Sequence, residues 1–223
     1  MYPAVHSKRP RIIGVGGLTS NVGKTTLVCE LLQFFPGWEA IKTTRGHYRS
    51  CGKDPHTCCV SDLLDTEPVI RSGRELTYAP GKDTGRYWDA GATNVHWVIA
   101  TDEQVSDGIQ NAVDRVQASG VIIEGNSFTE YVRPDFFVMV ARADDLKSKA
   151  SAKRALSFVS AYYFSGELTP DAEKELEPAL QPLDPARGRN SVPLFTRRTL
   201  VELGTLLQDL TAEKTISISG KPK

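Results

Sequence analysis

Hydrophobic and polar positions along this chain follow two alternating periods. Short apolar runs predict buried strands at 11–15, 39–43, 95–100, 121–123 and 136–140. Between several of these runs the apolar residues keep helical spacing, as in a helix expected from Lys24 to about Phe35 with Leu27, Val28, Leu31 and Leu32. Strands that alternate with helices predict an α/β fold in which helices cover both faces of a mostly parallel sheet. Such sheets bind ligands at the carboxyl ends of their strands.

The rest of the chain continues this pattern less regularly. Further helices are expected at 83–90, 146–164, 169–180 and 199–210, and a last short strand at 192–195. Another helix is expected to follow a capping box at 101–104. The stretch from about 45 to 80 has scattered glycine, proline, cysteine and charge, so we interpret it as an insertion with short helical pieces. Residues 1–210 are then expected to form a single domain, and 211–223 a flexible tail.

Composition and charge narrow the classes of partner. Lysine and arginine together number 27, as do aspartate and glutamate, so the formal net charge is zero. This balance argues against a sequence-independent electrostatic grip on nucleic acid or on an anionic membrane. No apolar run reaches the roughly 20 residues of a membrane-spanning helix, and no secretory apolar stretch follows the first basic residues. We therefore expect a cytoplasmic protein without nucleic acid or membrane as partner, and a buried structural thiol at Cys29.

The strongest chemical signal is a glycine-rich loop between the first strand and the first helix, over Gly14–Thr26. Glycines let the backbone approach phosphate oxygens closely, while loop N–H groups and a helix N-terminus attract an anion. Lys24 supplies a positive charge for the β- and γ-phosphates of a nucleotide, and the Thr25 hydroxyl suits Mg²⁺. The residues expected to bind nucleotide here are Gly17, Ser20, Asn21, Val22, Gly23, Lys24, Thr25 and Thr26.

Four blocks of the sequence resemble two families of phosphate-loop proteins. Five residues separate Gly17 from Gly23, one more than in the standard loop, and this longer loop resembles that of dethiobiotin synthetase. The block Pro80-Gly81-Lys82-Asp83-Thr84-x-Arg86, followed by Gly91-Ala92 and an apolar strand, resembles molybdopterin-guanine dinucleotide biosynthesis protein B. Both families also place a lysine at the end of the second strand, here Lys42, and an acid with a glycine at the end of a later strand, here Glu124-Gly125.

The resemblance implies the three-layer sandwich of P-loop nucleoside triphosphatases, with Mg²⁺, GTP or ATP, and a homodimer as the working form. It gives catalytic roles to Lys24, Lys42, Asp83 and Glu124, and it implies Thr25, Asp83 and Glu124 as the residues at Mg²⁺. Arg86, like Lys42, would face the γ-phosphate or an anionic second substrate. For Asp83 and Arg86 the alternative is a solvated first turn of a helix, where acidic residues are common.

The choice of base is weakly encoded. The guanine-reading pattern Asn-Lys-x-Asp is absent, and the segment after the 136–140 strand keeps only Asp144. This aspartate either pairs with a guanine or caps the next helix. The resemblance favours GTP, and ATP stays open.

A second group of reactive side chains lies in the irregular segment. Thiols and imidazoles, which soft divalent metals such as Zn²⁺ prefer, stand within thirteen residues at His47, Cys51, His56, Cys58 and Cys59. The spacing, with two adjacent cysteines, departs from that of standard zinc sites. Either this cluster binds a soft metal or its thiols are incidental to a loop.

These features favour one function and leave two alternatives. The main prediction is a slow Mg²⁺-dependent GTPase or ATPase in molybdenum cofactor maturation, with molybdopterin or a molybdenum-cofactor protein as partner. The first alternative is an ATP-dependent ligase or kinase that acts on a small acid, as dethiobiotin synthetase does. The second is a nucleotidase that delivers a metal through the cysteine cluster, and a module that only binds nucleotide ranks last.

Two departures from the cofactor family leave the second substrate open. Thr44–Arg49 stands where that family usually has a histidine-rich stretch, and Asn126-Ser127 follows the acid and glycine where it commonly has phenylalanine.

Overall fold

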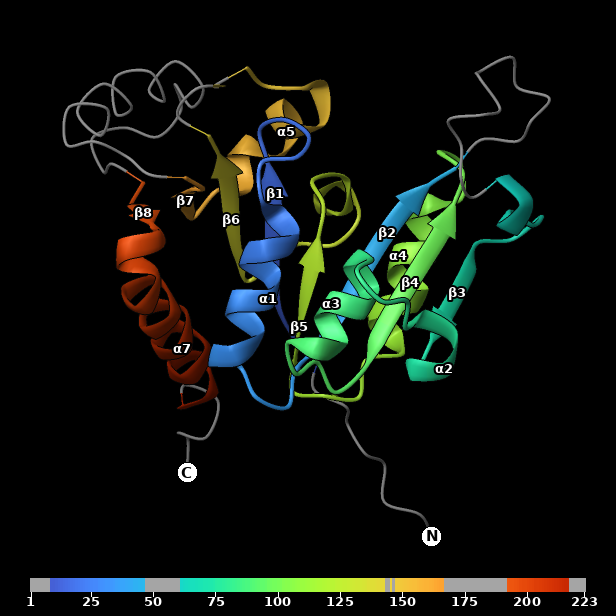
Figure 1. The fold of residues 1–223 in the computed structure, drawn as a ribbon, viewed down its shortest axis with the longest axis horizontal. Helices are drawn as coiled ribbons and strands as arrows, with labels where there is room; N and C mark the ends of the chain where they lie inside the picture. Colours follow the sequence, from blue (N-terminus) through green and yellow to red (C-terminus); the bar gives the residue numbers. More distant parts are fainter. Residues whose placement is uncertain (1–8, 47–60, 143–144, 146, 167–191, 217–223) are drawn as a thin grey trace, which may run out of the picture.

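The computed structural model describes residues 9–46, 61–142, 145, 147–166 and 192–216 (Figure 1). Their strands form one sheet in the order β3-β4-β2-β5-β1-β6-β7-β8. All neighbouring strands in it are parallel except β3 and β4, which pair antiparallel at one edge. The strands are β1 (Arg11–Gly17), β2 (Glu39–Arg45), β3 (Val69–Ser72), β4 (Val95–Ala100), β5 (Gly120–Glu124), β6 (Phe136–Ala141), β7 (Ala161–Phe164) and β8 (Leu194–Thr196).

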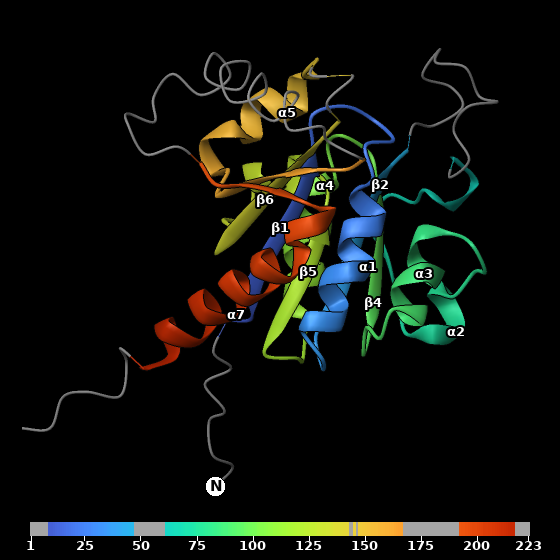
Figure 2. The same cartoon turned by 60° about the vertical axis from the view of Figure 1, so that its left-hand side comes forward.

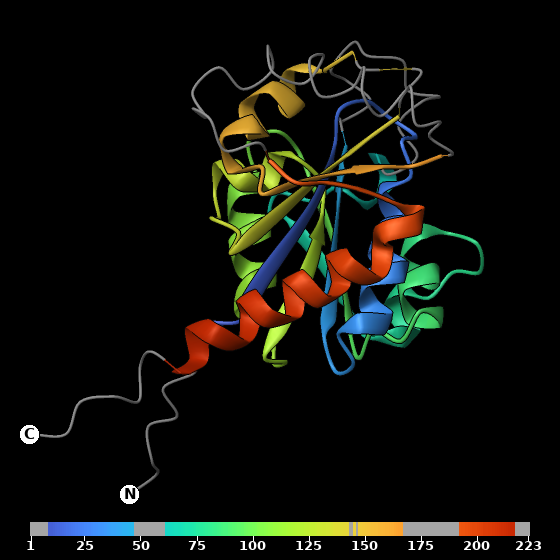
Figure 3. The same ribbon diagram turned by 90° about the vertical axis from the view of Figure 1, so that its left-hand side faces the viewer.

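Helices cover both faces of this sheet, as the alternating pattern predicts. One face carries α1 (Lys24–Phe34), α3 (Asp83–Asp89) and α7 (Leu200–Ile216), and the opposite face carries α4 (Val105–Asp114) and α5 (Ala150–Ala155) (Figures 1 and 2). Seen from the side, α7 crosses next to α1 (Figure 3). The short helix α2 (Arg74–Thr77) follows β3, and 3₁₀ turns occupy η2 (Ser61–Leu63), η3 (Ser127–Glu130), η4 (Leu156–Phe158) and η6 (Arg197–Thr199).

Two apolar cores hold the three layers together. On the α1 side, buried Leu27, Leu31 and Leu203 pack against the sheet. On the α4 side, buried Ile109 and Phe128 do the same. Burial of each such side chain contributes about 1.5–3 kcal/mol. The arrangement confirms the predicted three-layer α/β sandwich with a mostly parallel sheet.

Most predicted elements are present with small shifts at their ends. The strand at 95–100 matches β4, and the helix from Lys24 matches α1 to within one residue. The other strands of the sheet centre run one or two residues further than predicted. At the capping box, the Thr101 amide donates to Gln104 Oε1 over 3.0 Å, but α4 begins only at Val105.

Among the weaker regions, one predicted helix is wrong and two other regions differ in part from the prediction. The helix predicted at 146–164 is only α5 and η4, because Ala161–Phe164 forms the buried strand β7 between β6 and β8. Tyrosine and phenylalanine favour such pleated, buried positions. In the described part of the predicted insertion, the expected short helical pieces are η2 and α2, and the strand β3 is present in addition. The last helix α7 continues to Ile216, beyond the predicted end at 210. The helix expected at 169–180 lies outside the described residues.

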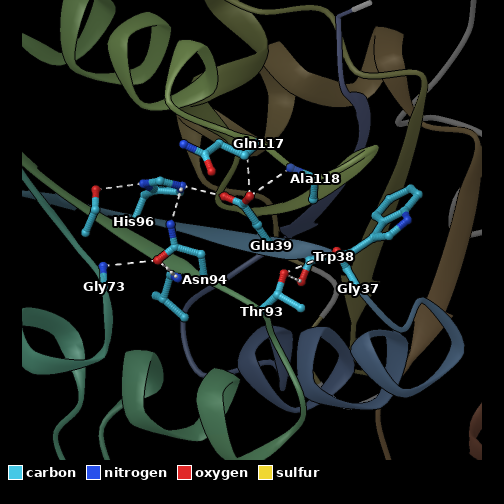
Figure 4. A network of polar contacts seen from close by, with 11 residues as sticks. Gly37, Trp38, Glu39, Gly73, Thr93, Asn94, His96, Gln117 and Ala118 are labelled. Atoms are coloured by element: carbon cyan, nitrogen blue, oxygen red, sulfur yellow. Dashed lines mark hydrogen bonds and ion pairs between the residues drawn. The ribbon is translucent and has the colours of Figure 1, made fainter. Parts of the chain in front are cut away.

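A buried polar network fastens the edge strand β3 to the sheet (Figure 4). His96 of β4 bridges two neighbours: its Nδ1 lies 2.8 Å from the Ser72 hydroxyl of β3 and its Nε2 lies 2.7 Å from Glu39 Oε2 of β2. Glu39 Oε1 accepts hydrogen bonds of 2.9 Å from the amides of Gln117 and Ala118, which precede β5. His96 and Glu39 are almost fully buried. The Glu39 carboxylate thus joins β2 to β4 and to the approach to β5, and His96 extends the network to β3.

Replacing Glu39 with alanine is expected to destabilise the fold by about 3–5 kcal/mol, because His96 and two amides lose their buried partner. Burial would raise the pKa of Glu39, but the hydrogen bonds from His96, Ala118 and Gln117 outweigh it and hold the pKa below its usual value. Since the folded pKa is lowered, this stabilisation is present above a pH of about 4.3 and is lost as the pH falls through the folded pKa. Urea unfolding of the wild type and of Glu39→Ala, at pH 7 and at pH 3, measures the loss of stability and its dependence on pH. Equal stability at pH 7 would contradict the role assigned to Glu39.

Candidate functional site

The glycine-rich loop is fixed at its start by an asparagine from the neighbouring strand end. Asn126, which follows β5, exchanges two hydrogen bonds with Gly17: Oδ1 accepts from the Gly17 amide at 2.8 Å and Nδ2 donates to the Gly17 carbonyl at 2.9 Å. A Cβ on Gly16 would lie 2.4 Å from Asn126 Oδ1, so glycine is required there. The Leu18 amide then donates to the Val140 carbonyl of β6 at 3.0 Å.

The loop closes over the start of α1 through left-handed backbone. Asn21 has φ 58° and Gly23 has φ 92°, a region that glycine and asparagine reach most easily. A Cβ on Gly17 would lie 3.0 Å from Lys24 Cδ, so the missing side chain leaves room for the lysine stem. Among the described residues no side chain caps α1, and the first turn of this helix holds no acid. Its first N–H groups therefore remain available to an anion.

Four side chains that the sequence singles out meet beside this loop. The Lys42 ammonium at β2 lies 2.6 Å from Asp83 Oδ2 of α3 and 2.6 Å from Glu124 Oε1 of β5. The Thr25 hydroxyl lies 2.8 Å from Glu124 Oε2 and 3.1 Å from Asp83 Oδ1. A hydroxyl, an ammonium and two carboxylates from four separate elements thus form one cluster at the carboxyl ends of the strands.

The charges in this cluster support one another. Burial would lower the pKa of Lys42, but the Glu124 charge and the hydrogen bonds to both carboxylates outweigh it and raise the pKa. Burial would raise the pKa of Asp83, but Lys42 and Thr25 outweigh it and lower the pKa. Lys24 differs, because burial lowers its pKa and the nearby Glu124 only partly offsets this. Its partly desolvated ammonium is therefore well suited to an added anion.

The helix α3 docks onto α1 with a glycine-dependent geometry. The Arg86 guanidinium donates to the Thr26 hydroxyl over 3.1 Å, so it faces the first turn of α1. Gly81 has φ 74°, and a Cβ on Gly85 would lie 2.0 Å from the Ala79 carbonyl oxygen. The glycines of this block therefore set the approach of Asp83 and Arg86 to the loop.

Three contributors to the site were missed by the sequence analysis. Asn126 counted there only as a departure from a family pattern. The Tyr87 hydroxyl donates to Glu124 Oε2, and burial, then the Glu124 charge, raises the pKa of Tyr87 well above its usual value. Lys149, whose amide donates to the Leu18 carbonyl at 3.0 Å, has its pKa lowered first by burial, with Glu124 and Lys42 close enough to act on it. Only its spacing of four residues after Asp83, which puts both on the same helix face, points to Tyr87 in the sequence.

Cys29 lies under α3 and is half-buried rather than buried. Its thiol donates to the Arg86 carbonyl at 3.5 Å, and burial raises its pKa to about 11. It therefore stays a neutral packing residue.

Other predicted site residues lie outside the described part of the chain. These are Asp144 and the soft-metal candidates His47, Cys51, His56, Cys58 and Cys59. Within the described ranges, no group of three or more His, Cys, Asp or Glu side chains could hold a metal ion. Ser20 is exposed in the loop. Of the helices seen here, none has the length and apolar character needed to cross a membrane.

The cluster around Thr25 has the chemistry of a magnesium site. Mg²⁺ is bound through carboxylate, hydroxyl and water oxygens, and Thr25, Asp83 and Glu124 supply a hydroxyl and two carboxylates. The Lys42 ammonium already sits between these carboxylates, so this environment stabilises a cation. The residues present therefore fit the ion.

The parallel strand order and the loop between β1 and α1 define the fold of P-loop nucleoside triphosphatases. No family model and no curated protein matches the sequence. Among solved structures, the chain is similar to HypB from Helicobacter pylori in complex with nickel, with a TM-score of 0.54 and 11% identity over 92% of this chain and 89% of that chain.

Two further structures match less closely. A LAO/AO transport system kinase has a TM-score of 0.48 and 16% identity, over 94% of this chain and 62% of that chain. LpxK from Aquifex aeolicus in complex with ATP has a TM-score of 0.46 and 17% identity, over 85% and 54%. At these identities the likeness concerns the fold.

Proposed function

We propose that this protein binds a nucleoside triphosphate with Mg²⁺ and hydrolyses it slowly. The observation that carries this proposal is the position of Lys24, whose stem passes Gly17 at an uncapped helix start beside the Thr25, Asp83 and Glu124 cluster. A positive charge, free N–H groups and oxygen ligands for a cation in one place are what a magnesium nucleotide needs. The P-loop fold shared with HypB supports the same proposal.

Each residue then has a defined task. The loop amides and Lys24 hold the β- and γ-phosphates, and the first turn of α1 adds its N–H groups. Thr25, Asp83 and Glu124 would hold Mg²⁺, and the ion would neutralise the charge that develops on the phosphates. Lys42 and Arg86 face the γ-phosphate or a second anion. Asp83, which stands beside both Thr25 and Lys42, orients the attacking water.

The finer role we propose is that of a homodimeric adapter in molybdenum cofactor maturation that prefers GTP. The glycine-dependent docking of α3 supports it, because the Gly81–Arg86 block carries the family resemblance and reaches the first turn of α1 through Arg86. Hydrolysis alone should be slow and should increase when molybdopterin or its carrier protein is added. Rapid turnover without any partner would contradict this role.

An ATP-dependent ligase or kinase acting on a small acid is the second candidate. The observation that favours it is the gathering of Lys24, Lys42 and Lys149 near Glu124, where a carboxylate substrate would find cations. Turnover should then rise sharply with the right acid, and an unchanged rate across a panel of small carboxylates would count against it.

Metal delivery is a third candidate, and the nickel complex of the similar protein HypB supports it. If the cluster binds metal, Cys58→Ser with Cys59→Ser should abolish stoichiometric binding of Zn²⁺ or Ni²⁺.

The direct test of hydrolysis is phosphate release from GTP and from ATP. We expect slow release with Mg²⁺ and none when EDTA removes it, because the phosphates then lack charge neutralisation. With Mg²⁺ present, the rates of phosphate release from GTP and from ATP should scale with protein concentration and vanish in Lys24→Ala. Equal release with and without Mg²⁺ would contradict the proposed function.

A further inference from the structure

The Glu124 carboxylate receives three donors in the structure. Its Oε1 takes the Lys42 ammonium, and its Oε2 takes the hydroxyls of Thr25 and Tyr87. Glu124 is only 4% exposed, so these groups replace the water that an ionised carboxylate needs. The orientation of this carboxylate therefore depends on which donors remain in place.

Two of the three donors have other tasks under the proposed function. Thr25 and Lys42 would turn to Mg²⁺ and to an anion once the magnesium nucleotide is bound. Tyr87 has no such task, because its side chain is fully buried, within the apolar core between α3 and α1. Its hydroxyl is the donor that can hold Glu124 in the same orientation before and after the nucleotide enters.

We propose that Tyr87 is a positioning residue that fixes the Glu124 carboxylate for Mg²⁺. This inference rests on the proposed function and extends it to a residue that contacts neither nucleotide nor metal. Because Tyr87 lies one helical turn after Asp83 in α3, the same short helix carries one magnesium ligand and orients the other. The docking of α3, set by Gly85 against Ala79, then decides the geometry of both carboxylates.

The test is Tyr87→Phe, which removes the hydroxyl and keeps the ring in the core. Loss of one buried hydrogen bond is small against the stability of a whole domain, so the variant should fold. Mn²⁺ serves as the probe, and its binding to the protein with GDP is followed by electron paramagnetic resonance. Mutation of a residue that hydrogen-bonds to a metal ligand typically lowers metal affinity by about 10- to 100-fold, and we expect Tyr87→Phe to lose Mn²⁺ affinity in this range. Affinity for GDP in EDTA should stay within about twofold of wild type.

Tyr78→Phe is the matched control, since it makes the same chemical change at a partly exposed tyrosine of the α2–α3 connection. A second readout separates positioning from packing. In a background of Glu124→Ala, which leaves the Tyr87 hydroxyl nothing to orient, Tyr87→Phe should cause almost no further loss of Mn²⁺ affinity.

The inference is overturned if Tyr87→Phe binds Mn²⁺ as tightly as wild type, or if its effect is unchanged in the Glu124→Ala background. A different result would contradict the proposed function, namely wild-type protein that binds no nucleotide at all. The two failures are therefore distinguishable in the same titrations.

Discussion

Replacement of Lys24 with alanine is expected to weaken nucleotide binding by about 100-fold or more. Truncation of one member of a desolvated charge pair costs about 2–5 kcal/mol, and each 1.4 kcal/mol is a factor of ten in affinity. The lowered pKa of Lys24 reflects burial that only an added anion would compensate fully. Because no carboxylate in the described part of the chain forms an ion pair with this ammonium, its removal should leave the fold intact.

Fluorescence titration with a labelled GDP or ADP measures this effect, and the thermal midpoint checks the fold. Lys153→Ala is the control, since Lys153 is an exposed lysine of α5. The control should bind as wild type does. A Lys24→Ala protein that binds nucleotide within threefold of wild type would show that the loop is not the phosphate site.

Replacement of Glu124 with glutamine is expected to lower kcat by about 100-fold, because one charged oxygen ligand for Mg²⁺ is lost at the centre of the site. Glutamine keeps the shape and still offers an oxygen to Tyr87 and Thr25. Its amide cannot balance the buried Lys42 ammonium, so Lys42 should turn fully to Asp83. Nucleotide affinity without Mg²⁺ should change little, since the loop amides and Lys24 are untouched.

Single-turnover hydrolysis and the Mg²⁺ concentration at half-maximal rate measure the loss. Glu202→Gln, at an exposed glutamate in the first turn of α7, is the control and should behave as wild type. Full activity in Glu124→Gln would remove this residue from the metal site.

The sheet was predictable where apolar runs are short and bounded. Val95–Ala100 is six residues between polar segments, and a buried parallel strand was the only element of that length and composition that fits. Ala161–Phe164 was misread because residues 150–158 in front of it are helical, so one helical pattern seemed to continue. The strands that pair with it, β6 and β8, are distant in sequence, so the local pattern of apolar residues gives no information about this pairing.

The site was predictable as far as motifs carry chemistry. Thr25, Lys42, Asp83 and Glu124 stand apart by up to 99 residues. Glu124 ends β5, Thr25 and Asp83 lie at the starts of α1 and α3, and Lys42 lies inside β2, three residues before its end. Tyr87 and Asn126 escaped notice because their tasks depend on what they touch rather than on their type. A buried tyrosine and an asparagine after a glycine look ordinary until the structure places them on Glu124 and Gly17.

The most direct test of the central claim is titration calorimetry of the wild-type protein with non-hydrolysable analogues of GTP and ATP. The account predicts saturable binding of one nucleotide per chain for at least one of the two, tighter with Mg²⁺ than with EDTA. Failure of both analogues to saturate the protein at millimolar concentration, with Mg²⁺ present, would contradict it.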